Sequence, residues 1–321
     1  MPNPENLKGL QPKRGTKRRT TRTRAPISAT VLQVQNLLAT GKSVSQIAEL
    51  LNISQRHVYN VKRKIREGQG STTPSEPTLY ELLRPELKER IAFTADAFED
   101  FFNTYSNRTL QPIHKQWVQD MVENTRLLIN VPPRHAKSTI FSVWVPIWLI
   151  CGNKNEQILI VSQTDKLAKK FTNEIAYNLS SNSDLIKDYG PFMSSDSDWP
   201  WRPNSGELMV QGRTRSNKSG DLTIQVRGSG QQILGMEATW VIIGDPVSRK
   251  NSASEGVRES LSEWFHGDVM SRLERDGRAI CVGQRIHMQD LYGEIAKERD
   301  PRGAPSWKHI KYPAILDWDG K

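Results

Sequence analysis

The stretch from Arg126 to Thr139 constrains the fold of this chain more than any other feature. After Arg126 it reads LLINVPPRHAKST: an apolar run, two prolines and a short polar turn, followed by a second apolar segment, Ile140–Ile150. A strand, a tight turn and a helix start in this order form a cradle for anions. Turn N–H groups and the positive end of the helix dipole converge there. The stretch therefore predicts a phosphate-binding loop within an α/β domain.

The lysine of such a loop reaches the β- and γ-phosphates of a nucleotide, and the next hydroxyl binds Mg²⁺, so we expect Lys137 and Ser138 to take these roles. The usual pattern is G-x-x-x-x-G-K-[ST], but Val131 and Ala136 stand at its glycine positions. The alternative interpretation is a strand–turn–helix connection with an incidental Lys-Ser pair. The residues expected to surround the nucleotide phosphates are Pro133, Arg134, His135, Ala136, Lys137, Ser138 and Thr139.

The form P-P-R-H-A-K-S resembles the deviant phosphate loop of the large terminase subunits, the ATPase motors that pump DNA into viral capsids. Further segments fit that family in order: HKQW at 114–117, ILIVSQTDKLAKKFTNEI at 158–175, RGSGQQILGMEATWVIIGDP at 227–246 and GRAICVGQRIHMQDLYGEI at 277–295. The resemblance covers about residues 108–316. It implies a mainly parallel P-loop sheet of the ASCE type, flanked by helices, that binds ATP and Mg²⁺.

In that family an apolar strand ends in two adjacent acids and a proline; one acid orders the Mg²⁺ shell and the other polarises the attacking water. This chain reads Gly244-Asp245-Pro246 there. The resemblance implies that Asp245 takes the water-activating position and that Gly244 has lost the metal-side carboxylate. Three interpretations stay open: Asp245 binds the metal while another group orients water, hydrolysis is slow, or the chain holds ATP without hydrolysing it. We expect Asp245 to be catalytic and, with Ser138, a metal ligand.

Three more residues are candidates for the nucleotide site. The roles of Gln116 and Gln284 come from the family resemblance, and that of Arg134 comes from the chemistry of phosphoryl transfer. Gln116 is the candidate for adenine binding. Gln284 stands at a strand tip where the family usually has a hydroxyl, and its amide can sense the γ-phosphate by hydrogen bonding. Arg134, inside the loop, is the candidate cation for charge that develops during phosphoryl transfer. His287 and Asp290 have no third ligand nearby, so a turn capped by Asp290 explains them better than a metal site does.

Positive charge is concentrated at the N-terminus. Residues 1–66 hold 14 Lys/Arg and 2 Glu, a net of +12 against +10 for the whole chain. Such asymmetry predicts a segment that faces nucleic acid, joined to a nearly neutral globular body. The first residues are basic with almost nothing apolar to bury, so we expect a disordered arm there.

Residues 29–66 predict three short helices resembling a helix-turn-helix. Ser43 and Gln46 have the spacing of a capping box at the second helix. We expect the inward positions to be Ile47, Ala48, Leu50, Leu51, Val58, Val61 and Ile65. Base readers would be Gln55, Arg56 and Asn60, and phosphate contacts Lys62, Arg63, Lys64 and Arg66. The alternative is a plain three-helix bundle with a charged surface.

The expected organisation is an arm at 1–27, the helix-turn-helix at 28–67, a linker at 68–78, a helical lead-in at 79–107 and the terminase-like ATPase domain at 108–321. Strands are predicted at Leu127–Val131, Ile158–Ser162, Trp240–Gly244 and Ala279–Gly283, with a β-hairpin at Glu207–Arg227. Helices are predicted at Pro112–Glu123, Thr139–Ile150, Asp165–Leu179, Gly256–Glu274 and Asp290–Glu298. No signal peptide or membrane span is expected, and the two cysteines should be buried thiols.

These features predict a viral packaging ATPase that couples phosphoanhydride hydrolysis to movement of double-stranded DNA in the host cytoplasm. The family implies a homo-oligomeric ring on the capsid, a portal protein and a small terminase subunit as partners. Its usual nuclease domain is expected to be absent here, so a nuclease could act in trans, and an arginine from a neighbouring subunit could act at the site. The rival interpretation is a non-catalytic DNA-binding or regulatory protein on a degenerate ATPase core. A second rival is a helicase of similar core.

Overall fold

The computed structural model describes residues 42–50, 83–194, 200–215, 222–233 and 235–313, and the single positions Val34, Leu38, Gln55, Val58, Tyr59, Val61 and Lys62. Contacts divide the chain into two compact units, Met1–Glu76 and Pro77–Lys321. The expected arm and linker lie outside the described residues. No helix within the described ranges is both long and apolar enough to cross a membrane.

In the small unit, the second predicted helix is α2 (Val44–Leu50). The Ser43 N–H donates to Gln46 Oε1 at 2.9 Å, and the Gln46 N–H donates to Ser43 Oγ at 3.3 Å. Two otherwise unpaired amides at the helix start are thereby satisfied reciprocally. The predicted capping box is confirmed.

The core of the small unit joins Val34, Ile47, Ala48, Val58 and Val61, so four predicted inward positions are confirmed. The prediction for Leu50 is wrong, because its side chain is 59% exposed. Leu50 lies two residues beyond Ala48, which places it roughly 200° further around the helix, away from this small core.

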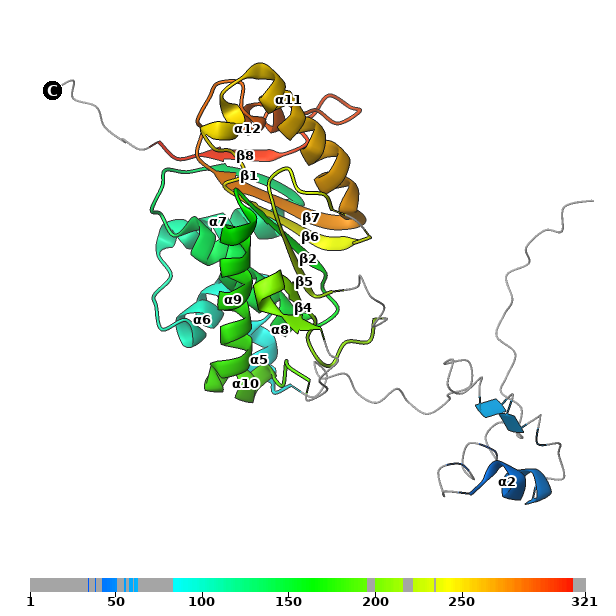
Figure 1. Cartoon of the computed structure of the whole chain (residues 1–321). Helices are drawn as coiled ribbons and strands as arrows, with labels where there is room; N and C mark the ends of the chain where they lie inside the picture. The colour runs from blue at the N-terminus through cyan, green and yellow to red at the C-terminus, as the bar shows by residue number, and fades with distance from the viewer. Residues whose placement is uncertain are drawn as a thin grey trace, which may run out of the picture. The chain divides into compact units, whose positions relative to one another are not determined.

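The large unit is built on one eight-stranded sheet in the order β3-β4-β5-β2-β6-β7-β1-β8 (Figure 1). The parallel strands are β5 (Ile224–Gly228), β2 (Ile158–Ser162), β6 (Ala238–Gly244), β7 (Leu273–Gly283), β1 (Arg126–Asn130) and β8 (Lys308–Lys311). The antiparallel edge is β3 (Trp201–Arg202) and β4 (Glu207–Leu208). One strand, β7, separates the phosphate-loop strand β1 from the acidic strand β6. This is the ASCE arrangement of a P-loop sheet, so the predicted fold class is confirmed.

Helices cover both faces of the sheet, as expected of parallel strands. One core contains side chains of α5 (Pro85–Arg90), α6 (Ala95–Tyr105), α7 (Pro112–Glu123), α8 (Val145–Gly152), α9 (Asp165–Ser181) and α10 (Ser183–Tyr189). A second core contains side chains of α11 (Glu255–Trp264) and α12 (Leu291–Ile295). Leu127 and Ile129 of β1 belong to the first core and Leu128 to the second, which is the alternation of a strand buried on both sides.

Several element boundaries differ from the predictions. The predicted helix Gly256–Glu274 ends at Trp264 and continues as a π turn (Phe265–Val269) and a 3₁₀ turn (Met270–Arg272). Strand β7 then starts at Leu273, because pairing with Ala238 of β6 extends it toward its N-terminus. The predicted helix Asp290–Glu298 is shorter, as α12 shows. The lead-in splits in two where Thr94 caps α6 by accepting a hydrogen bond from the Ala97 N–H at 3.2 Å.

The helix that follows the phosphate loop begins as a π-helix, whereas the sequence predicted an α-helix from Thr139. Residues Thr139–Trp144 form π turns before α8 begins at Val145. Pro146, the second residue of α8, directly follows these π turns and has no backbone N–H to donate to the preceding turn. Both cysteines are buried free thiols, as predicted, and burial raises the pKa of each.

Candidate functional site

The loop after β1 has an unusual backbone. Arg134 and Ala136 have φ angles of 67° and 55°, in the left-handed region that favours glycine. Each such residue costs about 1–3 kcal/mol and persists only where its surroundings hold it. Ala136 therefore adopts a glycine-like backbone at a position where glycine is usual.

Two histidines hold this loop in place. The His135 Nδ1 atom lies 3.2 Å from the Pro132 carbonyl oxygen and 3.0 Å from that of Pro133. The His114 Nε2 atom of α7 lies 3.1 Å from the His135 carbonyl oxygen. Burial lowers the pKa of His114, and the hydrogen bond to the His135 carbonyl offsets part of this change. These contacts compensate for the strained backbone.

The loop ends with amide groups that the helix itself does not use. The Ile140 N–H donates to the Ala136 carbonyl at 3.0 Å, and the amides before it have no acceptor within the helix. Ser138 precedes the first π turn, and its side chain makes no capping hydrogen bond. Its hydroxyl and the preceding amides can therefore bind a ligand.

Lys137 and Asp245 meet at the carboxyl edge of the sheet. The Lys137 Nζ atom lies 3.2 Å from Asp245 Oδ2, and only 8% of Lys137 is exposed. Asp245 directly follows β6 with a φ of 48°, and its N–H donates to the Val282 carbonyl of β7 at 2.8 Å. The loop after β1 and the end of β6 thus bring a nearly buried amine and a carboxylate together, across the intervening strand.

A cavity of about 540 Å³ opens beside this pair. Four residues predicted from the sequence line it: Pro133, Lys137, Asp245 and Gln284. Its other lining residues are Gln163, Leu167, Val247, Ser248, Arg249, Arg285 and Ile286. The sequence reasoning gave no site role to Gln163, Ser248 or Arg249. Gln163 directly follows β2, and the rule that ligands bind at the carboxyl ends of parallel strands could have found it.

Other predicted site residues lie elsewhere. Gln116 is exposed on α7, donates to Asp120 Oδ2 at 3.4 Å and does not line this cavity. Arg134 is exposed and likewise does not line it. Ser138 and Thr139 are half-buried at the helix start, while His135 and Ala136 are exposed in the loop.

Gly244 is buried at the end of β6 and faces the helix that follows the phosphate loop. A Cβ atom at Gly244 would lie 3.0 Å from the Ser142 Oγ atom. Ser142 is one helical turn beyond Ser138, and its buried hydroxyl has no hydrogen-bond partner among the described residues. A side chain at position 244 would therefore point toward the helix that carries the proposed metal-binding hydroxyl.

The described groups fit a magnesium–nucleotide complex better than a metal ion alone. No three His, Cys, Asp or Glu side chains in the described part of the chain are grouped as a metal site. Magnesium typically takes one or two protein oxygen ligands and completes its shell with phosphates and water. The Ser138 hydroxyl and the Asp245 carboxylate can supply those protein ligands.

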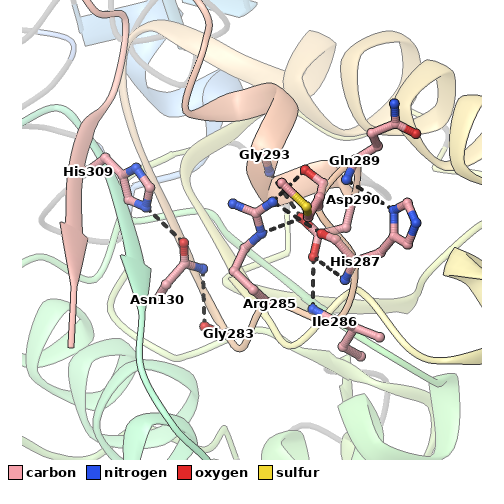
Figure 2. Close-up of polar contacts among 10 residues, drawn as sticks. Asn130, Gly283, Arg285, Ile286, His287, Gln289, Asp290, Gly293 and His309 are labelled. Atoms are coloured by element: carbon pink, nitrogen blue, oxygen red, sulfur yellow. Dashed lines mark hydrogen bonds and ion pairs between the residues drawn. The ribbon is translucent and has the colours of Figure 1, made fainter. Parts of the chain in front are cut away.

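The turn after β7 supplies Arg285 and Ile286 to the lining of this cavity, and Figure 2 shows its polar contacts. Arg285 Nε lies 2.7 Å from Asp290 Oδ1, and the Arg285 Nη2 group donates to the Met288 carbonyl at 2.6 Å. Asp290 is nearly fully buried and accepts from the Ile286 N–H at 2.9 Å and the Gly293 N–H at 3.1 Å. Asp290 therefore caps α12, and the interpretation of a capped turn is confirmed.

A second polar chain ties the strand ends together (Figure 2). The His309 Nε2 atom of β8 lies 2.8 Å from Asn130 Oδ1, and Asn130 Nδ2 donates to the Gly283 carbonyl at 3.2 Å. Burial and then the nearby Lys311 and Arg285 lower the pKa of His309. The ends of β8, β1 and β7 are thus fixed relative to one another beside the phosphate loop.

Of the predicted DNA-binding residues, Gln55 and Lys62 are described and both are exposed. Gln55 Nε2 also donates to Ser45 Oγ at 3.4 Å. Tyr59, between them, is 59% exposed, whereas Val58 and Val61 are buried. The other predicted contacts lie outside the described residues: Arg56, Asn60, Arg63, Lys64 and Arg66. The visible part of the third helix thus has an apolar inner face and a polar outer face.

Residues 28–72 match the family model of a homeodomain-like domain. The match covers the region in which the sequence predicts a helix-turn-helix. Comparison with curated protein sequences finds no match.

Solved structures similar to the chain include phage terminases and an RNA-bound protein. The HK97 bacteriophage large terminase has 12% identity and a TM-score of 0.44, over 70% of this chain and 45% of that one. A Thermus phage large terminase ATPase domain has 11% identity and a TM-score of 0.39, over 66% and 84%. A Saccharomyces cerevisiae Dbp5 variant bound to RNA and ADP BeF₃ has 13% identity and a TM-score of 0.39, over 74% and 52%. The matched region spans about half the length of the HK97 and Dbp5 chains.

Proposed function

We propose that this protein is an ATPase that moves double-stranded DNA, of the type that packages viral genomes. The observation that supports this most is the 3.2 Å contact between Lys137 and Asp245 beside a cavity of about 540 Å³. An amine from a strand–turn–helix loop and an acid from a strand two places away in the sheet are the groups that phosphate binding and water activation require.

Each proposed group has a defined task. Lys137 and the free loop amides bind the phosphates, and the residues expected around them stay as predicted, from Pro133 to Thr139. Bound Mg²⁺ would neutralise developing phosphate charge, with Ser138 and Asp245 as its protein ligands. Gln284 senses the γ-phosphate from the cavity wall, and Arg134 remains the proposed cation of the loop. Gln116 remains the proposed adenine contact, although it does not line this cavity.

The homeodomain-like region would hold the motor near its DNA. Gln55, Arg56 and Asn60 are the proposed base readers, and Lys62, Arg63, Lys64 and Arg66 the phosphate contacts. A net charge of +12 on residues 1–66 favours this role. A homo-oligomeric ring, a portal protein and a small terminase subunit complete the proposal, with the host cytoplasm as its location.

Phosphate release by the full chain tests the proposal. With Mg²⁺ and ATP, we expect turnover that long double-stranded DNA stimulates. No turnover under any of these conditions would contradict the enzyme proposal. Strand separation of a forked duplex at the same rate as ATP turnover would favour the helicase alternative instead.

A second candidate function rests on Gly244. The missing carboxylate favours a non-catalytic DNA-binding or regulatory protein that retains the ATPase fold. In this candidate the chain binds nucleotide at Lys137 without turning it over.

The variant Gly244→Asp separates the two functions. We expect it to raise Mg²⁺-dependent turnover on the order of tenfold, because it returns a carboxylate to the metal side. The Cβ would lie 3.0 Å from Ser142 Oγ, so that hydroxyl must shift slightly. Since the hydroxyl is unpartnered among the described residues, it can then donate to the new carboxylate.

Gly244→Asn is the matched control, since it has nearly the same size without the charge. Equal rates for the two variants would show that the added charge does not help. A complete lack of turnover in wild type and in Gly244→Asp, with nucleotide still bound, would favour the non-catalytic function.

A further inference from the structure

Tyr292 of α12 has a hydroxyl O–H donor for which the described structure provides no acceptor. Its side chain is fully buried in the second core. No described group accepts a hydrogen bond from this hydroxyl, and its oxygen interacts with the backbone of Val247. A buried, unsatisfied hydroxyl costs about 1–3 kcal/mol, so its presence in a packed core calls for a specific cause.

The hydroxyl and the Asp245 carboxylate both lie close to Gly283. A Cβ atom at Gly283, the last residue of β7, would overlap the Tyr292 hydroxyl. The same Cβ position is 3.0 Å from Asp245 Oδ1. The absence of a side chain at Gly283 therefore leaves the phenol and the carboxylate as neighbours around the same small space.

A tyrosine phenol is neutral at pH 7, because its ordinary pKa is about 10. A neutral phenol carries one O–H donor. The nearby Asp245 carboxylate can only accept.

In the structure described here, the Asp245 carboxylate is paired with Lys137 instead of with Tyr292. The other oxygen of Asp245, Oδ2, contacts the Lys137 amine at 3.2 Å. Nucleotide phosphates would compete for that amine, because they carry more charge than one carboxylate. In the nucleotide-bound state, Asp245 would then no longer be paired with Lys137, although it has to orient the attacking water or the metal ion in that state.

We propose that Tyr292 is a positioning residue that donates a hydrogen bond to Asp245 when bound nucleotide draws Lys137 away. This role rests on the proposed ATPase function. The hydrogen bond would fix the rotation of the carboxylate in the nucleotide-bound state. It would also connect the acid to α12, which begins at the capped turn holding Arg285.

The isosteric variant Tyr292→Phe tests this role in the full chain. It removes one oxygen atom and leaves the ring. We expect kcat for ATP to fall about tenfold, the effect of one hydrogen bond to a charged group, with KM changed less than twofold. We expect the melting temperature to stay constant or rise, because an unsatisfied hydroxyl leaves the core.

Tyr189→Phe is the control, because its buried hydroxyl donates to the Leu87 carbonyl at 3.0 Å, remote from the site. It should lower the melting temperature and leave kcat unchanged. For Tyr292→Phe, an unchanged kcat, or a kcat that falls only together with stability, would overturn the positioning role while leaving the ATPase intact. No turnover by the wild type would overturn both proposals.

Discussion

Replacing Lys137 with alanine is expected to lower ATP turnover about 100-fold or more, the usual cost of removing a preorganised charged donor. Lys137 is only 8% exposed and is in contact with Asp245. Without the amine, the cavity presents an unpaired carboxylate to the phosphates, so binding and turnover should both decline. The fold should persist, because the loop is held by His114 and His135 rather than by the lysine side chain.

Phosphate release at saturating DNA measures this effect. Lys187→Ala is the matched control, since Lys187 is an exposed lysine of α10. Circular dichroism should show equal helix content for both variants. A rate for Lys137→Ala within twofold of wild type would remove the nucleotide-binding interpretation of the loop.

Gly283→Ala is expected to lower the stability of the protein clearly. The added methyl would overlap the Tyr292 hydroxyl and lie 2.5 Å from its Cζ atom, inside a packed core. Overpacking of this kind costs about 1–3 kcal/mol. For a unit of this size each 1 kcal/mol corresponds to a fall of about 2–4 °C in melting temperature.

Thermal unfolding followed by circular dichroism checks this prediction. Gly256→Ala is the control, because a Cβ there meets nothing within 4 Å. The double variant Gly283→Ala/Tyr292→Phe should recover only part of the loss, since the overlap with the ring carbon remains. A Gly283→Ala protein as stable as wild type would show that α12 can move away, and that Tyr292 is not fixed beside Asp245.

The sequence was sufficient to predict the central strands because each is a short apolar run ended by Gly, Pro or a polar turn. The resemblance to the large terminase subunits, rather than spacing along the chain, predicted that Lys137 and Asp245 belong to one site. The short strands β3 and β8 could not be predicted. Their residues have no clear period, and only pairing with β4 and β1 makes them strands.

Other parts of the site depend on contacts between distant segments. Nothing in the local sequence shows that Ser142 lies opposite Gly244, or that Gly283 leaves room for Tyr292. The left-handed backbone of Ala136 is also hidden, because alanine usually avoids it. These features come from packing, which a pattern of residue types along the chain does not encode.

The contact between His114 and the His135 carbonyl has a mechanical consequence. His114 is on α7, and the next residue, Lys115, pairs with Asp96 and Glu99 of α6, each at 2.6 Å. If the loop moves toward a bound ligand, the contact between His135 and His114 would transmit that movement to α7. The lead-in helices are therefore coupled to the loop, so that a displacement of the turn would be transmitted to α7 and from there to α6.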